Sequence, residues 1–180
     1  MKIRDNYGEL SSGSGQINPT KAVNPGLIYD INEDLYISFL CKKGYDTRTI
    51  TLLIGGKKEY HCSSFKPGRG IDGLNYPSMH IYLNGTNPNI SAVFHRIVTN
   101  VEEGDLEYNV KVASPKELSI VVIPKMLKFI NGINQKKTFR VLVKGDESMM
   151  NGTEVVSATL EWNSNKGHSV KSPIVVFKQQ

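Results

Sequence analysis

The chain has 180 residues, 39% of them hydrophobic, which suits one folded domain or one domain with an extension and argues against general disorder. Its apolar runs, such as Ile120–Ile123, are far too short to span a bilayer, so we expect no membrane partner. The net charge of +5 is scattered, without aromatic residues interleaved in a nucleic-acid-binding motif, so we expect no nucleic acid either.

The first 30 residues predict loops. Residues 1–12 are polar and lack periodicity, with no apolar stretch of the signal-peptide kind. Residues 13–30 contain Gly-x-Gly and two Asn-Pro pairs, which predict an ordered loop that turns repeatedly. The third glycine of a dinucleotide motif and the Gly-Lys-Ser/Thr of a phosphate loop are both missing, so the sequence predicts no cofactor.

Residues 30–56 have a helical pattern. Asp30 or Asn32 can cap a first helix, which Gly44 would end. A second short helix is expected over residues 46–54, capped by Asp46 or Thr47 and ended by the glycine pair that follows it.

Cys41 and Cys62 are the only cysteines. Paired, they would join the end of the first helix to the loop after the second. Zinc could recruit His61, but two cysteines and one adjacent histidine fall short of a four-ligand site, so we expect no metal. The residues alone leave a disulfide and two free thiols as alternatives that depend on the redox compartment.

The last 110 residues predict strand after strand. In Leu106–Val112 and in Val156–Trp162, apolar residues alternate with polar ones, as in half-buried antiparallel strands. We expect strands over residues 75–83, 91–101, 106–113, 118–124, 136–144, 155–162 and 168–177, with a short one over 127–130. Pro173 suggests that the last strand lies at an edge or carries a bulge. This spacing fits an immunoglobulin- or fibronectin III-like antiparallel β-sandwich, so the fold class is mainly β.

Several motifs follow one another in the order of a known family. They are Gly13–Asp30, Asp34–Tyr45, Leu74-Asn-Tyr-Pro-Ser78, Arg96-Ile-Val-Thr-Asn-Val101 and the ending from Trp162 to Val176. The chain resembles the C-terminal part of plant subtilisin-like serine proteases, the cucumisin-like subtilases. The resemblance implies that residues 1–30 are the tail end of a subtilisin α/β catalytic domain, residues 31–70 a helical linker with the cysteine pair, and residues 71–180 a fibronectin III-like sandwich.

In this family the catalytic Asp, His and Ser lie upstream of the segment that matches Gly13–Asp30. No Gly-Thr-Ser motif occurs here, and none of the four histidines (His61, His80, His95 and His168) stands in a motif that would assemble a triad. We therefore expect no catalytic residue and no enzyme activity from this chain by itself.

The family is exported, and the resemblance implies a Cys41–Cys62 disulfide. Three sequons, at Asn84, Asn89 and Asn151, fall in predicted turns and are candidate glycosylation sites. If the chain belongs to an exported parent, its place is extracellular, in the apoplast.

The expected role is accessory: the sandwich stabilises a subtilase catalytic domain, in cis or in trans, or shapes access of substrate to it. Ile17, Val23 and Leu35 are among the apolar residues of segment 13–43, so we also expect self-association of the chain through that segment. The alternative is a free-standing sandwich that binds another protein or inhibits a protease.

Overall fold

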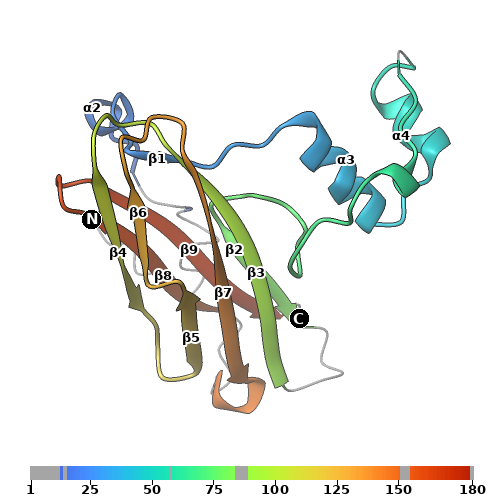
Figure 1. Cartoon of the computed structure of the whole chain (residues 1–180). Coiled ribbons are helices and arrows are strands. Elements are labelled where there is room, and N and C mark those ends of the chain that lie inside the picture. The colour runs from blue at the N-terminus through green and yellow to red at the C-terminus, as the bar shows by residue number, and fades with distance from the viewer. Residues whose placement is uncertain (1–12, 14–15, 57, 84–88, 151–154, 179–180) are drawn as a thin grey trace.

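The computed structural model describes residues 13, 16–56, 58–83, 89–150 and 155–178. A β-sandwich makes up most of the molecule, and a small helical unit projects from one side of it (Figure 1). Within these ranges no helix is long and apolar enough to cross a membrane.

Two sheets form the sandwich. The strands are β1 (Leu27–Ile28), β2 (Met79–Leu83), β3 (Asn89–Asn100), β4 (Leu106–Ala113), β5 (Leu118–Ile123), β6 (Met126–Phe129), β7 (Lys136–Asp146), β8 (Val155–Ser164) and β9 (Ser169–Lys178). One sheet has the order β1-β3-β7-β5, and the other has the order β2-β9-β8-β4-β6. The predicted sandwich and each of its predicted strands, the short β6 included, are confirmed.

The pairing of β2 departs from the antiparallel arrangement of the other described strands. β2 pairs in parallel with β9, with Met79 opposite Ile174 and Leu83 opposite Lys178. These strands lie far apart in sequence, so no hairpin forces them to run in opposite directions. β9 is consequently an interior strand between β2 and β8 and not an edge strand. Pro173 lies opposite Thr159 of β8, but β2 begins to pair only at Ile174, so on the β2 side the proline has no partner strand to which it would have to donate.

Alternating side chains fill the space between the sheets. On β8, Val156, Ala158, Leu160 and Trp162 point inward, as their period predicts. The fully buried ring of Trp162 lies edge-on to Phe139 of β7, with 5.2 Å between the ring centroids. A fully buried aromatic pair that bridges the two sheets accounts for a large share of core burial.

The helices are α2 (Pro19–Ala22), α3 (Glu33–Lys42) and α4 (Thr47–Leu53), with short 3-10 turns η1 (Cys62–Ser64) and η2 (Glu147–Met150). Asn32 caps α3 by accepting from the N–H of Leu35 at 3.0 Å, and Asp46 caps α4 by accepting from the N–H of Thr49 at 2.8 Å. The helical unit consists of α3, α4 and η1. Its own small hydrophobic core is formed by Ile37, Ile50 and Tyr60.

The loop predicted before α3 contains a strand. β1 pairs with β3, with Leu27 opposite Asn100, and the side chain of Leu27 is only 3% exposed. The next residue but one, Tyr29, shares a hydrogen bond of 2.8 Å between its hydroxyl and that of Ser172. The chain is therefore already part of the sandwich before it makes the helical unit.

Candidate functional site

The connector, residues 66–78, joins the helical unit to the free edge of β3. Its Asn75 side chain donates to the carbonyls of Ile97 and Asp30, at 2.8 and 2.9 Å, and accepts from the N–H of Ile97 at 2.7 Å. One buried amide thus supplies the hydrogen bonds that a neighbouring strand would make. The chain leaves the sandwich at Asp30 and returns to it at Asn75. The hydrogen bond between these two residues therefore holds the two points side by side.

Arg96 is the second tie between β3 and the connector. Its side chain is fully buried, and its guanidinium pairs in bidentate fashion with Asp72, with 3.2 Å between Nη1 and Oδ1. It also donates to the carbonyls of Leu74 and Ser78, each at 3.0 Å. A buried guanidinium requires such partners because an unpaired charge in the interior is costly.

Lys42, the last residue of α3, is the third tie. Its ammonium donates to the carbonyl of Gly68 at 2.9 Å and to that of Gly70. The connector is held to the sheet as well, because the N–H of Ile71 donates to the carbonyl of Val93 at 2.8 Å. Helical unit, connector and sandwich are therefore linked by specific hydrogen bonds and not by a free tether.

These ties enclose a groove of about 620 Å³, called here the junction groove. Its lining comes from α3, from the connector, from β3 and β7, and from the end of β5. The apolar part consists of Leu35, Leu74, Ile97, Ile123 and Pro124, and the basic part of Lys66, Arg69, His95, Arg96 and Arg140. Burial and the neighbouring charges of Arg140 and Arg69 lower the pKa of His95. The imidazole is thus disfavoured as a cation, first because it is partly buried and second because its surroundings are already positive.

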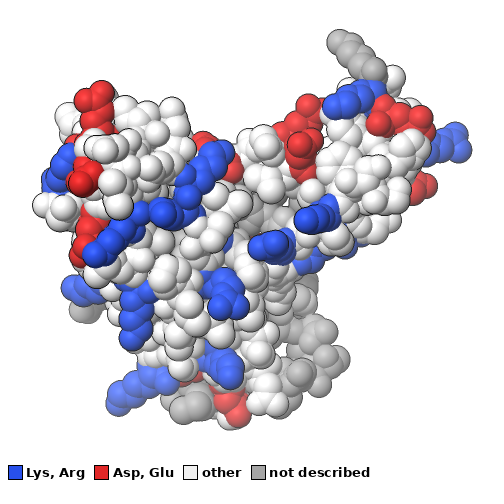
Figure 2. All heavy atoms as spheres, in the orientation of Figure 1, with Lys and Arg blue, Asp and Glu red and all other residues white. Residues whose placement is uncertain are grey.

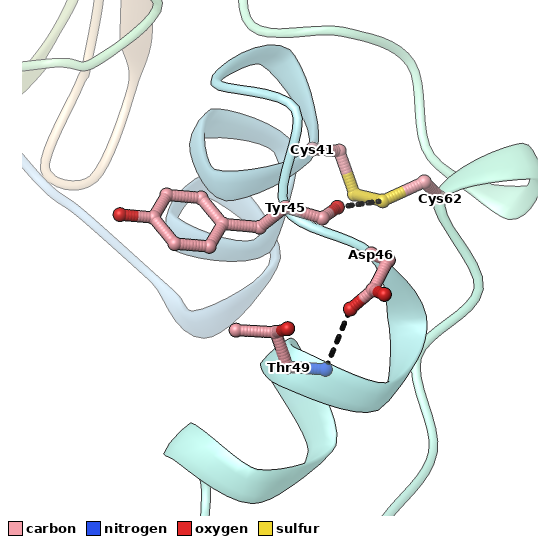
Figure 3. The surroundings of a disulfide bond; sticks show 5 residues. All are labelled: Cys41, Tyr45, Asp46, Thr49 and Cys62. Atoms are coloured by element: carbon pink, nitrogen blue, oxygen red, sulfur yellow. Dashed lines mark hydrogen bonds between the residues drawn. A yellow bond between two sulfur atoms is a disulfide. The ribbon is translucent and has the colours of Figure 1, made fainter.

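A disulfide closes the helical unit. Cys41, near the end of α3, is bonded to Cys62 at the start of η1 (Figure 3). The carbonyl oxygen of Tyr45 lies 3.5 Å from Sγ of Cys62; this is a contact and not a hydrogen bond, because a disulfide sulfur has no proton to donate. The predicted pairing of the two cysteines is what the structure shows.

The surface of the helical unit carries exposed apolar side chains. Leu52 and Leu53 of α4 are 70% and 62% exposed, and Tyr36 and Tyr45 are each 45% exposed. Ile17 and Val23, next to α2, are also exposed, but Leu27 is buried and Leu35 is half-buried. Apolar surface of this kind commonly marks a contact with another protein.

The remaining predicted site residues do not converge. Asn89 is the exposed first residue of β3, whereas Asn84 and Asn151 lie outside the described residues. Among the histidines, His61 is exposed just before η1 and His80 is exposed on β2, while His95 lines the junction groove and His168 contacts the carboxylate of Glu102. The structure brings together no two of these histidines.

Sequence reasoning missed the junction groove and the ties around it. The Leu74–Ser78 and Arg96–Val101 motifs each resemble the family by themselves, and the structure shows that they contact each other. One signal could have identified Arg96: it occupies an inward-facing position of β3, and the other inward residues from Ile90 to Val98 are apolar. A charge at such a position predicts a buried partner.

The described geometry defines a fibronectin III-like sandwich with an attached helical unit. Residues 73–176 match the family model described as "Fibronectin type-III domain", and the chain belongs to this family. It is 47% identical over 186 residues to subtilisin-like protease SBT4.15 of Arabidopsis thaliana, and the match covers 99% of this chain and 24% of that protein. Subtilisin-like protease SBT4.14 of the same plant is 41% identical, with 94% and 22% covered.

The resemblance to plant subtilisin-like proteases is thereby confirmed, for their C-terminal segment and not for their catalytic domain. The chain spans about a quarter of the length of these relatives. Among solved structures, a PapD-like domain of human CEP192 aligns with 57% of this chain and 82% of that domain, at 8% identity and a TM-score of 0.38.

Proposed function

We propose that this chain is the non-catalytic C-terminal part of a subtilisin-like serine endopeptidase, and that it stabilises the protease body by docking against it. One observation carries the proposal: the helical unit exposes Leu52, Leu53, Tyr36 and Tyr45 while its position on the sandwich is held by Lys42 and the connector. A rigidly mounted apolar surface loses little conformational entropy when it binds. On this proposal the chain is exported with its parent protease. Its sandwich also shapes the access of substrate to the catalytic domain.

A chimera tests the proposal. In it, this chain replaces the matching segment of subtilisin-like protease SBT4.15, and the thermal midpoint and peptidase activity are measured. We expect an active protease that the Leu52→Asp/Leu53→Asp double variant makes less thermally stable, because two charges would then be buried at the contact. Ile130→Asp is the matched control, since Ile130 is 66% exposed on the sandwich.

Two results would contradict the proposal. The first is an equal effect of the double variant and the Ile130→Asp control on the protease body. The second is inhibition of the intact protease by the isolated chain added in trans, which would favour a free-standing inhibitory module.

A further inference from the structure

The junction groove has unneutralised positive charge. Lys66, Arg69 and Arg140 are exposed, and among the described residues none of them forms an ion pair. The carboxylate of Asp72 is paired with Arg96, and no acidic residue belongs to the lining of the groove within the described part of the chain. In Figure 2, Lys and Arg side chains predominate over the part of the sandwich next to the helical unit. Charge complementarity therefore favours an anionic occupant.

The apolar part of the lining favours a peptide over a small inorganic anion as the ligand of the groove. Leu74 of the connector and Ile123 of β5 belong to the lining together with Arg69 and Arg140, and Ile123 is 42% exposed. A small inorganic anion would leave this apolar surface in water. An extended peptide can use both kinds of surface, because its side chains alternate between its two sides.

The size of the groove also suits a short peptide. Its volume of about 620 Å³ lies within the range of roughly 300–1,000 Å³ that is usual for pockets enclosing small ligands. Its walls are held in place by the ties through Lys42, Asn75 and Arg96, so little ordering is needed before a ligand binds.

We propose that the junction groove binds a short extended peptide segment of a partner protein, in which carboxylates pair with Arg69 and Arg140 and an apolar side chain contacts Leu74 and Ile123. This site goes beyond the proposed function, because it uses a different surface from the exposed leucines of α4. Either proposal can fail without the other.

Fluorescence anisotropy with the full chain tests the site. The probes are three fluorescein-labelled hexapeptides in which leucine alternates with glutamate, with glutamine or with lysine. We expect the glutamate peptide to bind at least tenfold more tightly than the glutamine peptide, the lysine peptide to bind weakest, and added salt to weaken the glutamate complex. A fourth peptide, with serine in place of leucine, should also bind more weakly.

Charge-reversal variants locate the site. Arg69→Glu/Arg140→Glu should weaken binding of the glutamate peptide at least tenfold. The control is Lys111→Glu/Lys144→Glu, which changes the net charge equally at exposed positions outside the groove, with Lys144 on the same strand as Arg140. This control should change affinity less than threefold.

Three outcomes would overturn the proposal. They are equal binding of the glutamate and glutamine peptides, equal weakening by the two double variants, and equal displacement of the peptide by millimolar inorganic phosphate and by unlabelled glutamate peptide. The first would remove the role of charge, the second would show unspecific attraction to a basic surface, and the third would show a general anion site.

Discussion

The side chain of Arg96 is fully buried, whereas the side chain of Asp72, whose carboxylate neutralises it, remains 27% exposed. The two residues belong to different parts of the molecule, since Arg96 lies in β3 and Asp72 in the connector. Their ion pair therefore couples the sandwich to the segment that carries the helical unit. The coupling can be measured.

Arg96→Ala should lower the free energy of unfolding by about 3–5 kcal/mol, because it leaves the Asp72 carboxylate and three carbonyls, that of His95 included, without this partner. Chemical denaturation followed by tryptophan fluorescence measures this loss, since the only tryptophan, Trp162, lies in the sandwich core. Arg140→Ala is the control: an exposed arginine without an ion pair among the described residues should cost no more than about 0.5 kcal/mol. Equal costs for the two variants would show that the buried pair contributes nothing specific.

Gly26 should tolerate substitution less well than Gly55. Both glycines have positive φ, at 75° and 80°, so alanine at either position loses about 1 kcal/mol of backbone stability. A Cβ at Gly26 would also lie 2.5 Å from the hydroxyl of Tyr108 and 2.8 Å from Cγ of His168, whereas no atom of the described residues lies within 4 Å of a Cβ at Gly55. Gly26→Ala should therefore have a lower thermal midpoint than Gly55→Ala. Equal midpoints would mean that the backbone around Gly26 can shift to admit a Cβ at no cost in stability.

Stability should fall at alkaline pH through Tyr108. Burial raises the pKa of Tyr108 to about 12, from its ordinary value of 10, with a further contribution from Glu102. The hydroxyl binds its proton more tightly in the folded state, so the stabilisation is complete below pH 10 and is lost as the pH rises toward 12. Tyr108→Phe should show a shallower loss over this interval. Parallel curves for the two proteins between pH 9 and pH 12 would refute the assignment.

Tyr108→Phe should also be well tolerated at neutral pH. The hydroxyl of Tyr108 is buried and has no hydrogen-bond partner among the described residues, so removing it uncovers no other polar group. Denaturation at pH 7 should place the variant within about 1 kcal/mol of the parent chain. A larger loss would indicate a partner for the hydroxyl that the described residues do not include.

The Cys41–Cys62 disulfide should contribute about 3 kcal/mol to the helical unit if the chain-entropy model holds for two cysteines 21 residues apart. In Cys41→Ser/Cys62→Ser, hydrogen exchange should become faster in α3 and α4 and stay nearly unchanged in β7 and β8. Mass mapping after alkylation checks the bond itself: two cysteines that alkylate freely without prior reduction would contradict it. Equal loss of protection across the sandwich would mean that the two units unfold together.

Self-association of the chain also remains a prediction. Ile17 and Val23 are 86% and 88% exposed, and light scattering on the parent chain and on Ile17→Asp/Val23→Asp should show a dimer only for the parent. Point variants suit this test better than deletion of the N-terminal 70 residues, because the shortened chain would lack β1. A monomeric parent chain would contradict the prediction.

The strands could be predicted from the sequence because a period of two is a local signal. In Val156–Trp162, each inward residue is apolar, and the structure buries all of them. The caps of α3 and α4 were predictable for the same reason, although Asn32 and not Asp30 caps α3. The carboxylate of Asp30 instead accepts a hydrogen bond from Thr99 and contacts Lys136, both distant in sequence.

What could not be predicted depends on such distant partners. β1 has only two residues, too few for any periodicity, and its partner Asn100 lies more than seventy residues away. The parallel pairing of β2 with β9, the ion pair of Arg96 and the junction groove all require the folded arrangement of segments that no local pattern relates. The family resemblance identified the right motifs without showing that they meet.

The early entry of the chain into the sandwich has a mechanical consequence. Because β1 pairs with β3 at Leu27 and Asn75 binds β3 at Ile97, both roots of the helical unit are anchored on one strand. The helical unit therefore has two attachment points on the sandwich. Two points restrict its rotation more than the single linker of a terminal domain would. A force applied to α4 would be divided between these two attachment points. A protein that binds the helical unit would consequently also fix the orientation of the sandwich.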